Sequence, residues 1–203
     1  MNRYTVIARE GHAPLLAALV VAFMVWHFVS LPASLLFWAL VVLVVFVFRD
    51  PERDIPSIPL AVVSPADGKI ASIDTIIDPY LQRQSIRVSV LMNVYGVFTT
   101  RSPVEGKVQE PPHRPTGVNT PHGVWLKTNE DDDVVMVMNK GRMNAGPRCY
   151  IRFGERIGQG KRCGFIPLGS RIDLYLPENS RLAVAVGDSV LGGADVIAYL
   201  VHA

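Results

Sequence analysis

The chain has 203 residues, a formal net charge of +2 and 49% hydrophobic residues. This length accommodates one globular domain with a smaller segment beside it. Its basic residues are scattered and no basic patch with aromatic residues occurs, so nucleic acid is not an expected partner. Cys149 and Cys163 have no CxxC pair and no histidine at ligand spacing, so we expect reduced thiols and neither a zinc site nor any other metal centre.

The first fifty residues hold most of the apolar character. No formally charged side chain occurs from 13 to 31 or from 33 to 48, and Ser30 and Pro32 interrupt the two runs. Each run is near the lower limit of a membrane-spanning helix, about 17 to 25 residues. The pattern predicts a membrane-associated apolar helical hairpin over residues 1–50, which either spans the bilayer twice or enters one leaflet. A signal peptide fits less well, because no small-residue cleavage site accompanies it.

Basic residues flank this hairpin on both sides. Arg3 and Arg9 precede the first apolar run, and Arg49 and Arg53 follow the second. The positive-inside rule therefore places both ends of the hairpin in the cytoplasm. We expect the rest of the chain to lie at the cytoplasmic face of the cell membrane.

Residues 51–59 contain three prolines and predict an extended linker. From residue 60 to residue 203, short apolar runs alternate with turn residues, and no segment keeps a helical period over three turns. This part is predicted to be a mainly β, antiparallel domain. The stretch 109–133, rich in proline and histidine and ending in an acidic cluster, is interpreted as a surface loop that could close over a site.

Two pairs of similar turns indicate an internal repeat. Residues 64–70 and 102–108 share the pattern Ser-Pro-x-acid-Gly-Lys-aliphatic, and residues 154–157 resemble residues 187–190. Two equivalent hairpins explain the first pair most simply. Turns of the second kind occur in the sandwich domains that carry lipoyl and biotinyl groups, so we expect a barrel-sandwich-like arrangement.

A Gly-Ser pair, Gly169-Ser170, stands directly before an alternating apolar run. Because glycine has no Cβ, the backbone can adopt conformations closed to other residues, and the Ser170 hydroxyl can approach the Gly169 carbonyl carbon. This arrangement suits an N-to-O acyl shift. Elimination of the resulting ester would break the chain between the two residues and convert Ser170 into a pyruvoyl group. The pair is also ordinary loop chemistry before a strand.

The motifs become specific when they are taken in order. After the apolar hairpin come the segments 48–51, 64–68, 92–95, 101–106, 154–158 and 168–177. Over nearly the whole chain this order resembles the short, pyruvoyl-dependent type of phosphatidylserine decarboxylase proenzyme. The resemblance implies self-cleavage between Gly169 and Ser170, a pyruvoyl cofactor derived from Ser170, and two fragments that stay together as a heterodimer.

The resemblance also implies a reaction and its residues. Phosphatidylserine would be decarboxylated to phosphatidylethanolamine, with the pyruvoyl carbonyl condensing with the substrate amine and taking up the electrons left by carbon dioxide. Asp67 matches the family aspartate associated with self-cleavage, so Ser170 and Asp67 are the expected catalytic residues. Asp67 is equally an ordinary residue of an Asp-Gly turn.

The chain departs from the family pattern at Phe98. Family members usually carry a histidine here, five residues before the proline that matches Pro103, and phenylalanine has no group that transfers a proton. His113 and His122 are the candidate substitute acid or base, although both also fit a plain loop. Three outcomes stay open: another group takes over, decarboxylation is slow, or the chain is a catalytically degenerate, membrane-anchored homologue that binds lipid headgroups or a partner.

Overall fold

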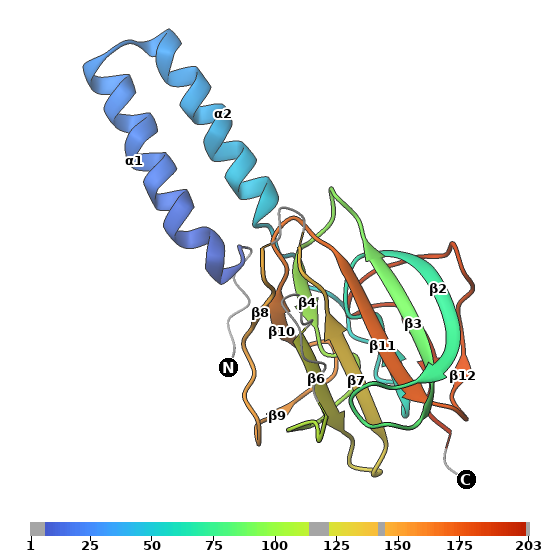
Figure 1. Ribbon diagram of the computed structural model, residues 1–203. Helices are drawn as coiled ribbons and strands as arrows, with labels where there is room; N and C mark the ends of the chain where they lie inside the picture. Colours follow the sequence, from blue (N-terminus) through green and yellow to red (C-terminus); the bar gives the residue numbers. More distant parts are fainter. Residues whose placement is uncertain (1–6, 114–121, 142–144, 202–203) are drawn as a thin grey trace. The chain divides into compact units, whose positions relative to one another are not determined.

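The computed structural model describes residues 7–113, 122–141 and 145–201, and the chain forms two compact units. We call residues 1–52 the hairpin unit and residues 53–203 the β unit. Figure 1 shows two helices in the first and the strands in the second.

Two antiparallel helices make up the hairpin unit (Figure 1). Its elements are η1 (Arg9–Gly11), α1 (His12–Phe28) and α2 (Leu31–Val47). Ala18 and Ala22 of α1 are buried together with Val41 of α2, and these small side chains let the two backbones approach closely. At the open end, the Ala8 N–H donates a 2.7 Å hydrogen bond to the carbonyl of Phe48. This bond ties the start of the hairpin to its end.

The outer surface of the hairpin is apolar. Leu16, Phe28 and Leu36 have exposed fractions of 65%, 78% and 75%. The segment 9–28 is long and apolar enough to cross a membrane, whereas α2 is shorter. The expected apolar helical hairpin before a β domain is confirmed.

Three antiparallel sheets form the β unit. The large sheet has the order β13-β2-β3-β11-β7-β6-β5-β9, and the two three-stranded sheets are β1-β14-β12 and β4-β10-β8. The strands are β1 (Ala61–Val63), β2 (Gly68–Ile77), β3 (Gln84–Met92), β4 (Thr99–Arg101), β5 (Gly106–Gln109), β6 (His122–Lys127), β7 (Asp133–Met138), β8 (Arg148–Cys149), β9 (Arg156–Ile157), β10 (Arg162–Phe165), β11 (Arg171–Pro177), β12 (Arg181–Leu182), β13 (Ser189–Val190) and β14 (Val196–Tyr199). The prediction of a mainly β, antiparallel domain is confirmed.

The middle of the large sheet is buried on both faces. One face carries apolar residues at every second position of β11, namely Ile172, Leu174 and Leu176, all fully buried. On the other face, Tyr175 packs with Tyr80 in a second apolar cluster. Burying a side chain of this size stabilises the fold by roughly 1.5 to 3 kcal/mol. The strand β11 is therefore firmly seated between β3 and β7.

The large sheet consists of two equivalent halves. Read inward from its two edges, β13-β2-β3-β11 corresponds to β9-β5-β6-β7. The repeated turns are alike in detail, because the hydroxyl of Ser64 donates to the carbonyl of Ala66 and that of Ser102 to the carbonyl of Val104, both at 2.8 Å. The internal repeat expected from the sequence is thus a structural repeat.

Backbone hydrogen bonds repeat in the same way. Equivalent N–H groups of the two halves donate to equivalent carbonyls. The pairs of bonds are Val63 to Pro103 with Arg101 to Pro65; Ile70 to Asp188 with Val108 to Glu155; Gly187 to Ile70 with Gly154 to Val108; Gly193 to Ser64 with Gly160 to Ser102; and Met92 to Ser170 with Thr128 to Asp132. The first of these pairs joins the two halves to one another. Asp67 and Glu105 occupy the same position of the repeated turn.

The interpretation of 109–133 as a surface loop is wrong for its later part. Residues 122–127 form β6, which pairs along its whole length with β7. Only Val124 and Leu126 supply the buried alternation, which is too little to stand out among prolines and glycines. Residues 114–121 lie outside the described part of the chain.

Candidate functional site

A tight turn leads into the Gly-Ser pair. The Gly169 N–H donates a 3.0 Å hydrogen bond to the carbonyl of Ile166, so Pro167 and Leu168 are the two central residues of the turn. Leu168 has a φ of +57°. Proline followed by a residue with positive φ is typical of a type II turn, which usually has glycine at the second of these positions. Leucine there stores backbone strain immediately before the pair.

Gly169 lies where a side chain is disfavoured. Its φ is +67°, in the left-handed region. A Cβ at this residue would lie 3.2 Å from Cβ of Met92 and 3.4 Å from Cε1 of Phe98. Conformation and packing therefore both favour glycine on the amino side of Ser170.

Ser170 directly precedes β11 and is partly buried. Its carbonyl accepts a 2.8 Å hydrogen bond from the Met92 N–H at the end of β3. The next residue, Arg171, is already paired with Leu91. The serine is thus held on the carboxyl side by regular sheet pairing and on the amino side by the strained turn.

Asp67 lies on the other side of the same strand end. Gly68 pairs with Met92, and the Asn93 N–H donates a 3.1 Å hydrogen bond to the Asp67 carbonyl. Ser170 and Asp67 therefore flank the end of β3 from β11 and β2, and two strand spacings separate their backbones by about 10 Å. Figure 1 shows β11 and β2 on either side of β3.

Both oxygens of the Asp67 carboxylate accept hydrogen bonds. Nη2 of Arg53 donates to Oδ2 at 2.7 Å, and the Gly192 N–H donates to Oδ1 at 2.8 Å. The Asp67 side chain is only 13% exposed. These two bonds fix the orientation of the carboxylate. Each oxygen keeps a further lone-pair site, so the carboxylate can still accept a hydrogen bond from another donor.

Phe98 forms an apolar wall beside Gly169. It is buried, it lies within van der Waals distance of the Gly169 position, and it meets Phe165 edge to face with 6.4 Å between ring centroids. Any proton-transferring group at position 98 would be in direct contact with the Gly-Ser pair. Phe98, where the sequence resemblance predicts a departure from the family pattern, therefore lies against the candidate site.

The two candidate histidines lie in different places. His122 begins β6 and pairs with Met138, which in turn pairs with Ile172 of β11, two residues after Ser170. The backbone N–H of His113 donates to the carbonyl of Tyr80, whose ring fills the space beside Gly123 on the face opposite to Ile172. The structure brings His122 to the sheet end that holds Ser170 and places His113 with Tyr80.

Comparison with known proteins decides the family. The model of the phosphatidylserine decarboxylase family matches residues 40–198. The chain belongs to this family. Proteins named phosphatidylserine decarboxylase proenzyme are similar over almost their whole length: the one from Nitrosomonas eutropha is 37% identical over 96% of this chain and 95% of its own, and that from Paraburkholderia xenovorans is 37% identical over 97% and 98%. The Burkholderia pseudomallei protein is 38% identical over 97% of this chain and 96% of its own. No solved structure gives a significant match.

In this member of the decarboxylase family, a buried polar network follows Ser170. Asp173 is 3% exposed and accepts hydrogen bonds from Ser89 Oγ at 2.5 Å and Asn139 Nδ2 at 2.9 Å, and Arg171 Nε lies 3.1 Å from its Oδ1. The network joins β3, β11 and the end of β7. Sequence reasoning missed it, although an acidic residue inside an apolar strand was a signal that could have found it.

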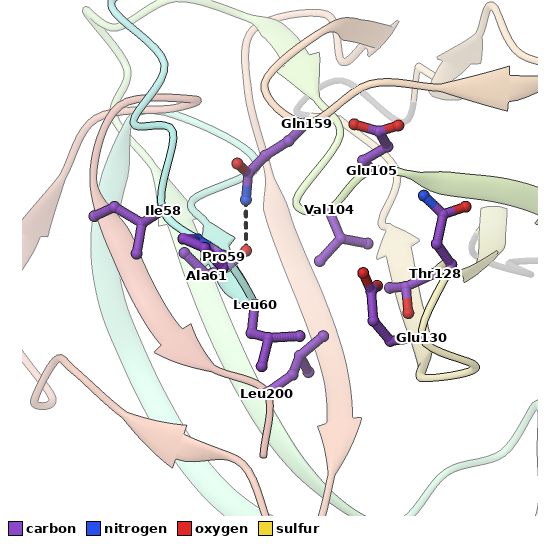
Figure 2. A pocket seen from close by; sticks show the side chains of 11 residues that line it. Ile58, Pro59, Leu60, Ala61, Val104, Glu105, Thr128, Glu130, Gln159 and Leu200 are labelled. Atoms are coloured by element: carbon purple, nitrogen blue, oxygen red, sulfur yellow. Dashed lines mark hydrogen bonds between the residues drawn. The ribbon is translucent and has the colours of Figure 1, made fainter. Parts of the chain in front are cut away.

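The described pocket of this family member is the repeat-related counterpart of the candidate site, not the site itself. Figure 2 shows Glu105 and Thr128 on one side of it and Leu60 and Leu200 on the other. Glu105 corresponds to Asp67 and Thr128 to Met92 in the two halves. The pocket therefore lies at the opposite end of β6 from His122.

The counterpart of the Gly-Ser pair has the same backbone but different side chains. Asp131 has a φ of +67°, equal to that of Gly169, and the carbonyl of Asp132 accepts from Thr128 as that of Ser170 accepts from Met92. Asp131-Asp132 offers no hydroxyl nucleophile. Among the described residues, the chemistry of a Gly-Ser pair is therefore confined to one half of the repeat.

Proposed function

We propose that this chain is a proenzyme that cleaves itself between Gly169 and Ser170 and decarboxylates phosphatidylserine with the pyruvoyl group so formed. Its family membership makes it a decarboxylase. The main support for self-cleavage is the left-handed conformation of Gly169, packed against Phe98 and directly before a partly buried serine. The relatives named as proenzymes agree with processing of this kind.

Self-cleavage needs only this peptide bond and water. The hydroxyl oxygen of Ser170 attacks the carbonyl carbon of Gly169, the C–N bond breaks, and an ester with a free amine on Ser170 results. Removal of the Ser170 Cα proton then expels the ester oxygen, which leaves with Gly169 as a carboxylate. The dehydrated residue tautomerises and is hydrolysed with loss of ammonia. The carboxyl-terminal fragment then begins with a pyruvoyl carbonyl.

We assign the proton transfers of this cleavage to Asp67. Arg53 and the Gly192 N–H hold its carboxylate in one orientation while leaving lone-pair sites for a proton donor. A carboxylate held in this way is preorganised for general base catalysis, which contributes about 10²- to 10⁴-fold. Because two strand spacings separate the backbones, we expect the transfer to pass through a water molecule or to follow a local movement of the turn.

The surroundings of Ser170 fit a pyruvoyl group that remains in place after cleavage. The strand β11 pairs on one side with β3 and on the other with β7, so the fragment that begins at residue 170 stays within the sheet. We therefore propose a heterodimer of the two fragments. When present, the pyruvoyl group supplies a carbonyl that accepts electrons as carbon dioxide leaves. The Phe98 and Phe165 rings exclude water on the Gly169 side.

The membrane assignment rests on the hairpin unit. We propose that residues 1–50 anchor the protein at the cytoplasmic face of the cell membrane. Residues 51–59 then link this anchor to residues 60–203, which carry out the reaction. The exposed apolar surface of both helices and the arginines that flank them support this assignment. Phosphatidylserine would then be met at the bilayer surface.

The test is the size of the purified protein. We expect two fragments on a denaturing gel, one that ends at Gly169 and one that begins at residue 170. By mass spectrometry, the carboxyl-terminal fragment should be lighter by the mass of one ammonia than the same fragment with an amino-terminal serine. Its amino terminus should resist Edman degradation. The Ser170→Ala variant should stay uncut. An uncut wild-type chain after prolonged incubation in detergent would contradict the proposal.

One observation favours a second candidate function. The apolar ring of Phe98 lies against Gly169, where the family usually has a titratable side chain, so a catalytically degenerate homologue that binds lipid headgroups or a partner is the alternative. Cleaved fragments that release no carbon dioxide from phosphatidylserine vesicles would favour this alternative. Cleavage with measurable carbon dioxide release would exclude it.

A further inference from the structure

Four exposed apolar side chains surround the candidate site on the β unit. Leu91, Val94, Tyr95 and Leu168 have exposed fractions of 49%, 43%, 73% and 36%. We call these four residues the apolar rim. They come from two segments far apart in the sequence that the hydrogen bond between Met92 and the Ser170 carbonyl holds side by side. Exposed apolar side chains thus lie next to the candidate site in both segments.

Cationic side chains accompany this rim. Lys69 and Arg171 lie directly opposite Leu91 on the two neighbouring strands, so a leucine is flanked by two positive charges in one row of the sheet. Lys69 is exposed, and half of the Arg171 side chain is accessible although it contacts Asp173. Asp67 is paired with Arg53, and Asp173, 3.1 Å from Arg171, offsets part of the charge of that arginine. The rim therefore combines apolar tips with a positive border.

We propose that the apolar rim inserts shallowly into an anionic bilayer surface and holds the candidate site at the depth of the lipid headgroups. Apolar tips with tyrosine and a basic border match the apolar and anionic layers of a membrane interface. Val94 and Tyr95 lie in the turn after β3 and Leu168 lies in the turn before β11, and the cations beside them favour an anionic bilayer surface over an apolar partner. The benefit for turnover rests on the proposed function, because the reacting amine and carboxylate of phosphatidylserine lie in that layer.

The direct test measures the depth of Tyr95 in the full chain. Tyr95→Cys is combined with Cys149→Ser, labelled with an environment-sensitive fluorophore and reconstituted into vesicles of phosphatidylserine and phosphatidylcholine. Ile77→Cys is the matched control, because Ile77 is also apolar and 62% exposed but lies at the far end of β2. Lipids with a nitroxide near the headgroup should quench the label at 95 at least about threefold more than the label at 77. Equal quenching would overturn the proposal.

A kinetic comparison tests the same surface in protein without a fluorescent label. The double variant Val94→Asp/Tyr95→Asp should raise the apparent KM for phosphatidylserine in vesicles about tenfold and change kcat much less, whereas Ile77→Asp should change neither. An unchanged KM would count against insertion. If the wild-type chain proves uncut, the proposed function fails, and the quenching comparison still decides whether the rim meets the bilayer.

Discussion

Arg53 Nη2 donates a 2.7 Å hydrogen bond to Oδ2 of Asp67, with both side chains less than one-fifth exposed. The pair connects the first residue of the β unit to the turn that precedes β2. Because Gly192 engages the other oxygen, the arginine completes the orientation of the carboxylate.

We therefore expect Arg53→Gln to slow self-cleavage about tenfold, since the Asp67 carboxylate loses one of its two fixed contacts. Arg53→Lys should restore most of the rate, because it keeps a cation that donates a hydrogen bond. Band intensities on a gel over time give the rate. Arg181→Gln, on the short strand β12, is the control and should cleave like the wild type. A normal rate in Arg53→Gln would mean that Gly192 alone orients the carboxylate.

Gly169→Ala should reduce cleavage at least tenfold. A side chain at a φ of +67° is strained by about 1 to 2 kcal/mol, and the new Cβ would press on Met92 and Phe98. Gly154→Ala is a matched control, because its φ is +88° and no atom lies within 4 Å of the added Cβ. It should bear the conformational strain without affecting cleavage. Similar cleavage in both variants would show that the fit around Gly169 is unimportant.

Phe98→His should raise the release of carbon dioxide from phosphatidylserine vesicles by about tenfold or more. The imidazole would lie against the Gly-Ser pair and supply a proton-transferring group where the present ring has none. Phe98→Leu keeps the apolar contact and should give no increase. If Phe98→His matches a robust wild-type rate, proton transfer at this position does not limit turnover.

Asp173→Ala should lower the free energy of unfolding by about 3 kcal/mol, because the buried donors of Ser89 and Asn139 lose their acceptor. Circular dichroism of the full chain in detergent, followed through a denaturant titration, measures the change. The exposed Glu178→Ala should shift the same transition by less than about 0.5 kcal/mol. A small effect at Asp173 would mean that water replaces the lost carboxylate.

The two thiols should differ in reactivity. Burial raises the pKa of Cys163 to about 12, and it also raises the pKa of the half-buried Cys149. At pH 8 only about one Cys163 in ten thousand is then a thiolate. Because the thiolate is the nucleophile, the alkylation rate of a thiol should rise about tenfold for each unit by which the pH is raised toward its pKa. Iodoacetamide should alkylate Cys149 slowly and Cys163 only after unfolding, as mass spectrometry of peptides would show. Rapid labelling of Cys163 in the native protein would contradict its burial.

Much of the fold was predictable because its signals are local. The two apolar runs specify the hairpin by composition, and the alternation in 171–176 specifies β11. The strand 122–127 was missed because it is defined by its pairing with β7, and its two buried residues are too few to indicate a strand in the sequence. The position of Phe98 against Gly169 has the same character. No local sequence pattern indicates that residues 98 and 169 are in contact.

The equivalence of the two halves is what duplication and fusion of a shorter ancestral chain would leave behind. The two halves still share backbone conformation, since Asp131 and Gly169 both have a φ of +67°. The side chains have diverged, and the half with Asp131-Asp132 contains no hydroxyl to attack the preceding carbonyl. The left-handed backbone conformation before Ser170 thus recurs at the other end of β7, in a segment whose side chains offer no hydroxyl nucleophile.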